Sequence, residues 1–370
     1  MKPIFAHLKD FFAFNRVVEA DKQLQGLAEA DRLLRQLIAT KKAPGIAISV
    51  FKEGEVFFQQ GYGYSDLDKN VLVNPQTTVF RIASVSKPIA ATALAHMVAD
   101  EIIDLDASFY SYVPYFPKKK WDFTIRQLAS HTAGIRGYRG KEYGLNEPYS
   151  IKESIAIFKN DELLFQPGTG YHYNSYDWVL ISLAMQEASG IPFESYVKEK
   201  VLVPLALENT FAATPNGLDV LDTDTLKITK FYSKCATGFR KAIAVNNYYK
   251  LAGGGYLSTS EDIVKLGQAY LDKRILNDEI LEQFMSSEIV NTELTYYGLG
   301  WQVSKDKKGR PFYGHIGNGV GGYSNFFVYP KQQMVIAILV NATNPNIQNE
   351  LDEVIDVLLR TTPEVMFYNK

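Results

Sequence analysis

Cysteine, histidine and net charge are all scarce in this 370-residue sequence. Its only cysteine, Cys235, cannot form a disulfide within the chain, and no cysteine cluster is present that could bind zinc. The surroundings of Cys235 contain no motif of a cysteine nucleophile. None of the histidines forms a His-Glu-x-x-His pair; they are His7, His96, His131, His172 and His315. We therefore expect no metal site and no cofactor.

Charge and hydropathy narrow the range of partners and compartments. The formal net charge is −2, so no basic field favours nucleic acid. No apolar run reaches the roughly 18 residues that a transmembrane helix needs. The first ten residues also lack the apolar core of a signal peptide. We expect a cytoplasmic protein, or a periplasmic or cell-surface protein if a leader was removed.

The apolar pattern predicts strands near both ends of the sequence. With 46% hydrophobic and 22% charged residues, the composition is that of a globular protein with a substantial core. Apolar residues recur at helical spacing over 20–40 and 347–360. Strands are predicted over 45–51 and 56–62, as a hairpin, and over 298–303, 311–315, 323–329 and 334–340.

The middle of the sequence, from residue 87 to about residue 205, has mainly helical spacing. The predicted fold class is α/β (α+β), an antiparallel sheet built from the N- and C-terminal segments and flanked by helices, with an inserted mainly helical subdomain. We expect one unit over 20–365. Residues 20–83 and 250–365 would form its α/β lobe and 84–249 its helical lobe, after an N-terminal extension over 1–19.

A Ser-x-x-Lys pair, Ser84 and Lys87, lies where a helix is predicted to begin. Residues three apart share one face of a helix, so the ammonium of Lys87 can approach the hydroxyl of Ser84. The free N–H groups and partial positive charge of a helix N-terminus favour a developing alkoxide and a lowered lysine pKa. The pair therefore fits an activated nucleophile, although an N-capping serine with a solvated lysine gives the same pattern.

A Tyr-x-Ser triplet, Tyr173 to Ser175, follows a Pro-Gly turn and precedes another predicted helix. Nearby lysine charge would lower the pKa of the Tyr173 phenol and let its oxygen exchange protons with a leaving group. A packing role is the alternative, because the sequence holds 23 tyrosines.

A glycine-rich stretch follows His315. Residues 317–322 match a Gly-x-Gly-x-x-Gly dinucleotide fingerprint. That fingerprint needs a helix after it, whereas 323–329 is predicted to be a strand. Glycines on a strand edge instead let a ligand approach closely, and His315 would present its imidazole to that ligand. A histidine that is hydrogen-bonded at a sheet edge is the alternative.

Taken in order, Ser84-x-x-Lys87, Tyr173-x-Ser175 and His315-x-Gly317 resemble the three signature elements of the penicillin-recognising serine hydrolases. That family contains class C β-lactamases, low-molecular-weight penicillin-binding proteins, D,D-peptidases and their esterase relatives. Similar stretches occur at 61–67, 124–134, 203–210, 253–259 and 297–301. The likeness is greatest to the mitochondrial β-lactamase-like serine protease branch and its bacterial relatives, on residues 130–136, 158–161 and 251–255.

The resemblance implies a catalytic role for the first two motifs. Ser84 would be the acylated nucleophile and Lys87 its base and proton relay. Tyr173 would carry the proton to the leaving group and help to activate water for deacylation. The backbone N–H groups of Ser84 and Asn318 would form the oxyanion hole.

Two positions depart from the family pattern. The second motif usually ends in Asn, but position 175 is Ser, and the third motif is His315-Ile316-Gly317 where Lys-Thr-Gly is usual. By resemblance Ser175 and Gly317 would contact the substrate, and His315 would belong to the catalytic residues. A histidine with an ordinary pKa of about 6.5 is mostly neutral at pH 7, so it suits a substrate carboxylate less well than lysine does.

We therefore expect a serine hydrolase that cleaves an ester or amide (peptide) bond of a small-molecule or peptide substrate, rather than an efficient β-lactamase. A D,D-carboxypeptidase or a weak class C-like β-lactamase is an alternative. Another is a non-catalytic member that binds peptides or assembles with itself. The mitochondrial branch polymerises, so the resemblance leaves room for a homo-oligomer.

Overall fold

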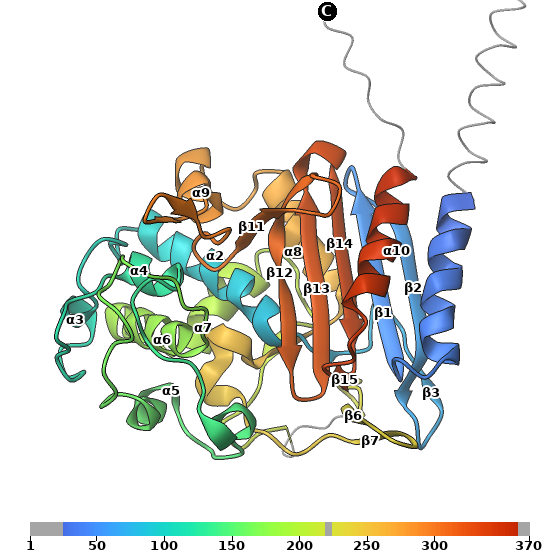
Figure 1. Cartoon of the computed structure of the whole chain (residues 1–370), viewed down its shortest axis with the longest axis horizontal. Helices are drawn as coiled ribbons and strands as arrows, with labels where there is room; N and C mark the ends of the chain where they lie inside the picture. Colours follow the sequence, from blue (N-terminus) through green and yellow to red (C-terminus); the bar gives the residue numbers. More distant parts are fainter. Residues whose placement is uncertain (1–24, 219–223, 362–370) are drawn as a thin grey trace, which may run out of the picture. The chain divides into compact units, whose positions relative to one another are not determined.

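The structure is a computed structural model that describes residues 25–218 and 224–361 (Figure 1). Its backbone contacts divide the described residues into two compact units, one of residues 25–43 and 346–361 and the other of residues 44–345. The lobe boundaries predicted above follow a different division and stay a prediction. The expected extension over 1–19 lies outside the described residues.

The smaller unit consists of two helices. Residues 25–39 are helical, which confirms the described part of the helix predicted over 20–40. The second helix, α10 (Gln348–Arg360), matches the helix predicted over 347–360 and has its apolar residues buried along one side. Within this unit Lys42 forms an ion pair with Glu350.

The larger unit is built on a seven-stranded antiparallel sheet with the order β11-β12-β13-β14-β1-β2-β3 (Figure 1). Strands from both ends of the sequence therefore meet in its centre, where Ile48 of β1 pairs with Ile338 of β14. This arrangement confirms the predicted fold class. The strands are β1 (Gly45–Lys52), β2 (Glu55–Asp66), β3 (Val71–Leu72), β11 (Gln302–Lys305), β12 (Pro311–Gly319), β13 (Gly322–Tyr329) and β14 (Met334–Val340).

Local sequence explains the regular parts of this sheet. β14 is a run of aliphatic residues that are all buried, as expected of a central strand covered on both faces. The hairpin between β1 and β2 turns at Glu53 and Gly54, which have φ of 53° and 84°. Two positive φ values are typical of the tight turn that matches strand twist. The sheet thus contains the hairpin that the sequence predicts.

One predicted strand begins later than expected. β11 starts at Gln302, so the prediction for 298–301 is wrong. The backbone turns there instead: the Gly298 N–H donates to the Trp301 carbonyl, and Gly300 has φ of 84°. A Cβ on Gly300 would lie 2.6 Å from the Trp178 ring, so tertiary packing decides the local conformation.

Helix α8 (Ser260–Leu271) packs on the sheet and contacts β1, β13 and β14. A Cβ on Gly267 would lie 2.5 Å from Val335 and 2.8 Å from Phe326. Glycine at this position therefore permits the close approach of helix and sheet.

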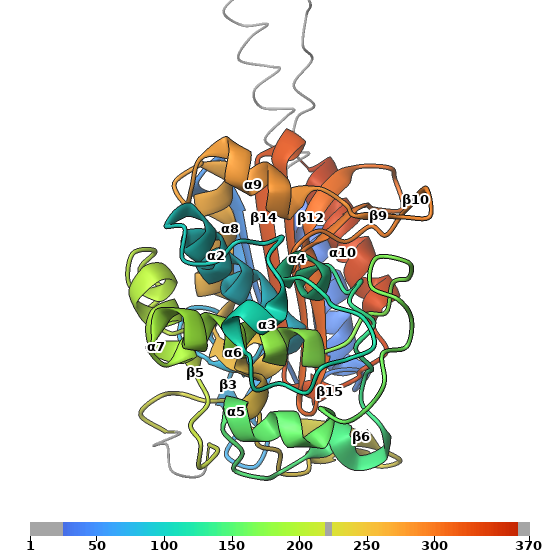
Figure 2. The same ribbon diagram turned by 90° about the vertical axis from the view of Figure 1, so that its left-hand side faces the viewer.

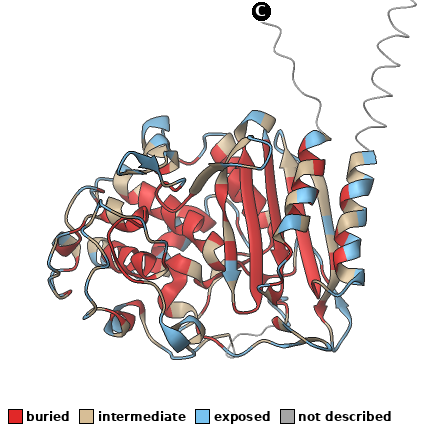
Figure 3. Cartoon of the chain, viewed as in Figure 1, coloured by how far each residue is buried: buried red, intermediate tan, exposed pale blue. Residues whose placement is uncertain are grey.

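The helices from the middle of the chain gather beyond the β11–β12 edge of the sheet (Figures 1 and 2). Two of them, α2 and α6, are buried around most of their circumference (Figure 3). The helical middle of the chain is thus confirmed. Its helices are η1 (Ala83–Val85), α2 (Ser86–Ala99), α3 (Phe109–Tyr112), α4 (Ile125–Ala129), η2 (Gly140–Gly144), α5 (Ile151–Ser154), η3 (Ile155–Ile157), α6 (Tyr176–Ser189), α7 (Phe193–Val197) and η4 (Lys198–Leu202).

Shorter elements complete the larger unit. A small sheet with the order β4-β8-β5 contacts the start of α2, where the Tyr256 N–H donates to the Ser86 hydroxyl. Among the described residues, no helix is both long enough and apolar enough to cross a membrane. The remaining elements are β4 (Phe80–Arg81), β5 (Phe211–Ala212), β6 (Tyr232–Cys235), β7 (Gly238–Lys241), β8 (Tyr256–Ser258), β9 (Ile289–Val290), β10 (Glu293–Leu294), β15 (Ala342–Thr343), η5 (Tyr248–Lys250), η6 (Leu251–Gly255), α9 (Asp278–Met285) and η7 (Pro330–Gln332).

Candidate active site

Ser84 lies in a tight connection between strand β4 and the buried helix α2. The residue before it, Ala83, has φ of 46°, in the left-handed region. Such a φ costs a non-glycine residue about 1 to 2 kcal/mol. Ser84 follows inside η1, which runs directly into α2. The strained turn therefore sets the position of the Ser84 side chain.

The Ser84 hydroxyl is part of a closed triangle of hydrogen bonds. Its Oγ accepts from Lys87 Nζ at 3.2 Å and from Tyr173 Oη at 2.8 Å. Lys87 Nζ also donates to Tyr173 Oη and to the Gly253 carbonyl, each at 2.9 Å. No described side chain caps the start of α2, whose N-cap residue is Val85. The alternative of an N-capping serine with a solvated lysine is therefore wrong.

Lys87 is completely buried. Burial lowers its pKa to about 7, an effect that the negative charge of Asp177 opposes and the positive charge of Lys250 reinforces. The predicted lowering is confirmed, but removal from water is its largest cause. An amine with this pKa is neutral in a large fraction of molecules at pH 7 and can then accept a proton.

The expectation for the Tyr173 phenol is wrong in sign. Burial raises the pKa of Tyr173, and the hydrogen bond to Ser84 only partly opposes this effect. The hydroxyl therefore stays protonated at neutral pH. The Tyr173 side chain is nevertheless 39% exposed. Solvent therefore reaches the Tyr173 side of the triangle, and water limits the rise of the Tyr173 pKa.

The edge of β12 lies against Ser84. A Cβ on Gly317 would lie 3.1 Å from the Ser84 backbone nitrogen and 2.4 Å from the Ile82 carbonyl oxygen, so the close approach requires glycine. The Ile316 N–H donates to Gln302, away from β13. Backbone N–H directions alternate along a strand, so the N–H of Asn318 points to the same side. Its oxyanion role stays a prediction.

His315 is buried behind this edge. Its Nδ1 lies 2.7 Å from the Ile316 carbonyl oxygen, and its Nε2 lies 3.0 Å from Tyr297 Oη. Burial, reinforced by the charge of Lys87, lowers the pKa of His315 to about 3, so the ring is neutral. Both ring nitrogens are therefore hydrogen-bonded to Ile316 and Tyr297 and not to the groups of the triangle. The predicted catalytic role of His315 stays a prediction, and its contacts favour a packing role.

Ser175 is the residue immediately before α6. Its side chain opposes the rise that burial causes in the pKa of the Tyr138 hydroxyl. A Cβ on Gly253 would lie 3.3 Å from the Cβ of Ser175, so Ser175 packs against the segment whose carbonyl holds Lys87. Its predicted contact with substrate stays a prediction.

A buried ionisable pair that the sequence did not predict lies behind Tyr173. His131 Nδ1 lies 2.7 Å from Asp177 Oδ2, and neither side chain is exposed by more than 1%. The His131 ring centroid lies 4.6 Å from that of Tyr173. A signal was present, because Asp177 is a charged residue inside a strongly apolar helical run.

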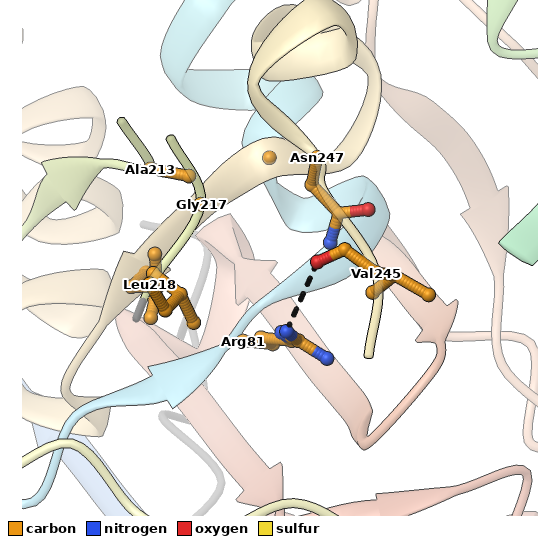
Figure 4. Close-up of a pocket in the computed structure, with 8 residues that line it drawn as sticks. Arg81, Ala213, Gly217, Leu218, Val245 and Asn247 are labelled. Atoms are coloured by element: carbon orange, nitrogen blue, oxygen red, sulfur yellow. Dashed lines mark hydrogen bonds between the residues drawn. The ribbon is translucent and has the colours of Figure 1, made fainter. Parts of the chain in front are cut away.

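Two further cations lie near the site. Lys250 is 7% exposed, and burial, with the charge of Arg81, lowers its pKa to about 7. The guanidinium of Arg81 donates to the Val320 carbonyl at 2.9 Å and lies over the Phe231 ring. Figure 4 shows Arg81 among the residues that line a small pocket, and the volume of this pocket is about 10 Å³. That volume holds about one water, so the pocket is too small for a substrate.

Comparison with known proteins places this geometry in context. The family model described as Beta-lactamase matches residues 30–359. The human mitochondrial serine β-lactamase-like protein LACTB is 26% identical over 415 residues, which cover 86% of this chain and 73% of that protein.

Two solved structures share the fold. The octameric penicillin-binding protein homologue from Pyrococcus abyssi aligns with a TM-score of 0.77 at 23% identity, covering 91% of this chain and 78% of that one. The D-amino acid amidase from Ochrobactrum anthropi SV3 aligns with a TM-score of 0.76 at 19% identity, covering 90% and 100%. At these identities the two likenesses support the fold alone.

Proposed function

The chain belongs to the β-lactamase family, and from that premise we propose that it is a serine hydrolase that cleaves an ester or amide (peptide) bond through an acyl-enzyme on Ser84. The observation that carries the proposal is the hydrogen-bonded triangle of Ser84, Lys87 and Tyr173. A non-catalytic member would have no need to keep a buried lysine in contact with a serine hydroxyl.

The proposed reaction begins with proton removal from Ser84. Neutral Lys87 accepts the hydroxyl proton, and Oγ attacks the substrate carbonyl carbon. As the bond to the leaving group breaks, the proton passes from Lys87 through the Tyr173 hydroxyl to the leaving oxygen or nitrogen. Water then attacks the acyl carbon and gives a proton to the Tyr173 and Lys87 relay. The bond between the acyl carbon and Oγ breaks as that proton passes to Ser84 Oγ.

Negative charge on the carbonyl oxygen would be stabilised by the N–H groups of Ser84 and Asn318. Support comes from the close approach of Gly317 to Ser84 and from the direction of the strand-edge N–H groups. Donors of this kind typically contribute about 3 kcal/mol each to transition-state stabilisation.

The neutral His315 bears on the choice of substrate. Its pKa of about 3 means that the third motif offers no cation to a substrate carboxylate at neutral pH. This supports an ester or amide substrate over a β-lactam. A homo-oligomer is part of the proposal only by analogy with the octameric relative.

Labelling with a fluorophosphonate probe and intact mass spectrometry test this proposal. We expect a single adduct on the native protein, none on Ser84→Ala, and a normal adduct on Ser195→Ala, which removes an exposed serine. Loss of the nucleophile typically removes several orders of magnitude in rate. Equal labelling of native protein and Ser84→Ala, or no labelling of either, would contradict the proposal.

A further inference from the structure

A buried carboxylate behind Tyr173, that of Asp177, has no part in the reaction as proposed. Its Oδ2 accepts from Asn174 Nδ2 at 2.6 Å and lies 2.7 Å from His131 Nδ1. The orientation of the Asn174 amide is fixed, because its Oδ1 accepts the Asp177 backbone N–H at 2.8 Å. Its Nδ2 can then only donate. Two polar groups thus converge on one carboxylate oxygen.

The imidazole of His131 connects this carboxylate to the active site. Its ring centroid lies 4.6 Å from that of Tyr173 and 4.9 Å from that of Tyr297. At its other end Nδ1 is bonded to Asp177. The Tyr173 ring, whose hydroxyl touches Ser84, therefore rests on an imidazole that Asp177 holds in place.

The His131–Asp177 pair would destabilise the fold if it had only a structural role. Among the buried residues of α6, all of which are described, Asp177 alone is charged. Its Oδ1 and the Nε2 of His131 have no hydrogen-bond partner among the described residues. A buried polar atom without a partner costs about 1 to 3 kcal/mol. These two atoms therefore lower the stability of the fold. This indicates that the pair has a role in the active site.

Electrostatic interaction also links the pair to Lys87. Burial raises the pKa of Asp177, while Asn174 and the charge of Lys87 oppose that rise. In return, Asp177 raises the pKa of Lys87. Burial and the charge of Lys87 lower the pKa of His131, so its imidazole is neutral. The other titratable groups around the three are Tyr171, His172, Tyr173, Lys250, Tyr297 and His315.

We infer that Asp177 and His131 are positioning residues for acyl transfer at Ser84. Asp177 fixes the His131 imidazole, which holds the Tyr173 ring and its hydroxyl in place beside Ser84. The negative charge of Asp177 also acts on Lys87, and it thereby sets the pH below which that base is protonated. The inference rests on the proposed function, because it assigns the pair a task in that reaction.

The pH dependence of ester hydrolysis by Asp177→Asn tests the effect of the Asp177 charge on Lys87. Native kcat/KM for p-nitrophenyl butyrate should fall below about pH 7, where Lys87 becomes protonated. Loss of the Asp177 charge makes that protonation harder, so the acid limb should move to lower pH by about one unit. The plateau should also fall, because the His131 ring is less firmly held.

Asp262→Asn is a matched control. Asp262 is also buried and accepts hydrogen bonds from Asn209 and Thr210, but it is not among the charges that act on Lys87. Its acid limb should stay at the native pH. If Asp177 has only a structural role, Asp177→Asn will lower the plateau of kcat/KM but leave the acid limb at the native pH. That result would overturn the inference.

Variants of His131 test the positioning step and serve if Asp177→Asn does not fold. His131→Asn can still donate to Asp177, whereas His131→Leu cannot. We expect kcat of His131→Asn to exceed that of His131→Leu by at least about tenfold, with similar KM. Equal kcat values in the two variants would overturn the positioning role.

Failure of the inference can be told apart from failure of the proposed function. If the native protein shows neither Ser84-dependent hydrolysis nor fluorophosphonate labelling, the proposed function is wrong. If the native protein is active but the limb of Asp177→Asn coincides with the native one, only the inference is wrong.

Discussion

The phenol oxygen of Tyr173 lies 2.8 Å from the hydroxyl oxygen of Ser84, although 89 positions separate them in the sequence. Lys87 Nζ reaches both oxygens from one turn of helix after Ser84. A proton can therefore move among three heteroatoms without crossing more than 3.2 Å. The short distances between these three groups lead to the following predictions.

Replacing Tyr173 with Phe should lower kcat of ester hydrolysis by about 10² to 10⁴, the usual contribution of a positioned proton-transfer group. KM should change little, because the ring remains. Burial raises the pKa of Tyr173, so no activity limb from this phenol should appear below its ordinary pKa of about 10. Steady-state kinetics of Tyr173→Phe across pH check both statements, and an unchanged kcat would contradict them.

Lys87 should make the stability of the protein depend on pH. Its pKa is about 7 in the folded chain and about 10.5 when unfolded, so the unfolded state binds more protons between these values. The free energy of unfolding should therefore rise with pH across this window by up to about 1.4 kcal/mol per unit from this group. Below about pH 7 both states are protonated and the contribution stays constant.

Urea unfolding of native protein and Lys87→Met at several pH values isolates that effect. The difference, native minus variant, should become more positive from pH 7 to pH 10, because methionine cannot titrate. Parallel curves for the two proteins would show that Lys87 keeps an ordinary pKa.

Gly317→Ala should abolish activity and destabilise the fold by about 1 to 3 kcal/mol, a typical cost of overpacking. The added methyl group would lie 2.3 Å from Ser324 Oγ and 2.4 Å from the Ile82 carbonyl oxygen. Gly254→Ala is the control, since its nearest neighbour would lie at 3.6 Å, an ordinary contact. Thermal unfolding and ester hydrolysis of both variants test this, and normal activity in Gly317→Ala would contradict it.

Substrate preference should follow from the neutral third motif. In a panel of p-nitrophenyl esters, D-Ala-D-Ala peptides and a chromogenic cephalosporin, we expect kcat/KM to be highest for an ester or amide substrate. Because His315 is neutral above about pH 3, its replacement by Lys should improve cephalosporin turnover relative to ester turnover. A cephalosporin as the best native substrate would contradict the proposed preference.

The sequence predicts those parts of the site that depend on local geometry. Ser84 and Lys87 are three residues apart, and helix geometry alone brings them together. The resemblance adds Tyr173, which the structure places in contact with both. The strands over 334–340 and 323–329 follow from their apolar and aromatic runs.

What the sequence does not predict depends on burial and distant contacts. The predicted sign of the Tyr173 pKa shift was wrong because burial, which raises the pKa, outweighs the hydrogen bond to Ser84, which lowers it. The His131–Asp177 pair joins residues 46 positions apart, and no local rule connects them. His315 fits a ligand-facing residue by its place beside glycines, yet its ring nitrogens are bonded to Ile316 and Tyr297.

The central claim is a covalent acyl intermediate on Ser84. Rapid mixing of the native protein with p-nitrophenyl butyrate, followed by acid quench, intact mass spectrometry and peptide mapping, measures it directly. The account predicts a transient mass gain of one butyryl group, located on the peptide that contains Ser84 and absent from Ser84→Ala. Hydrolysis by the native protein with no acylated species, or with the acyl group on another residue, would contradict it.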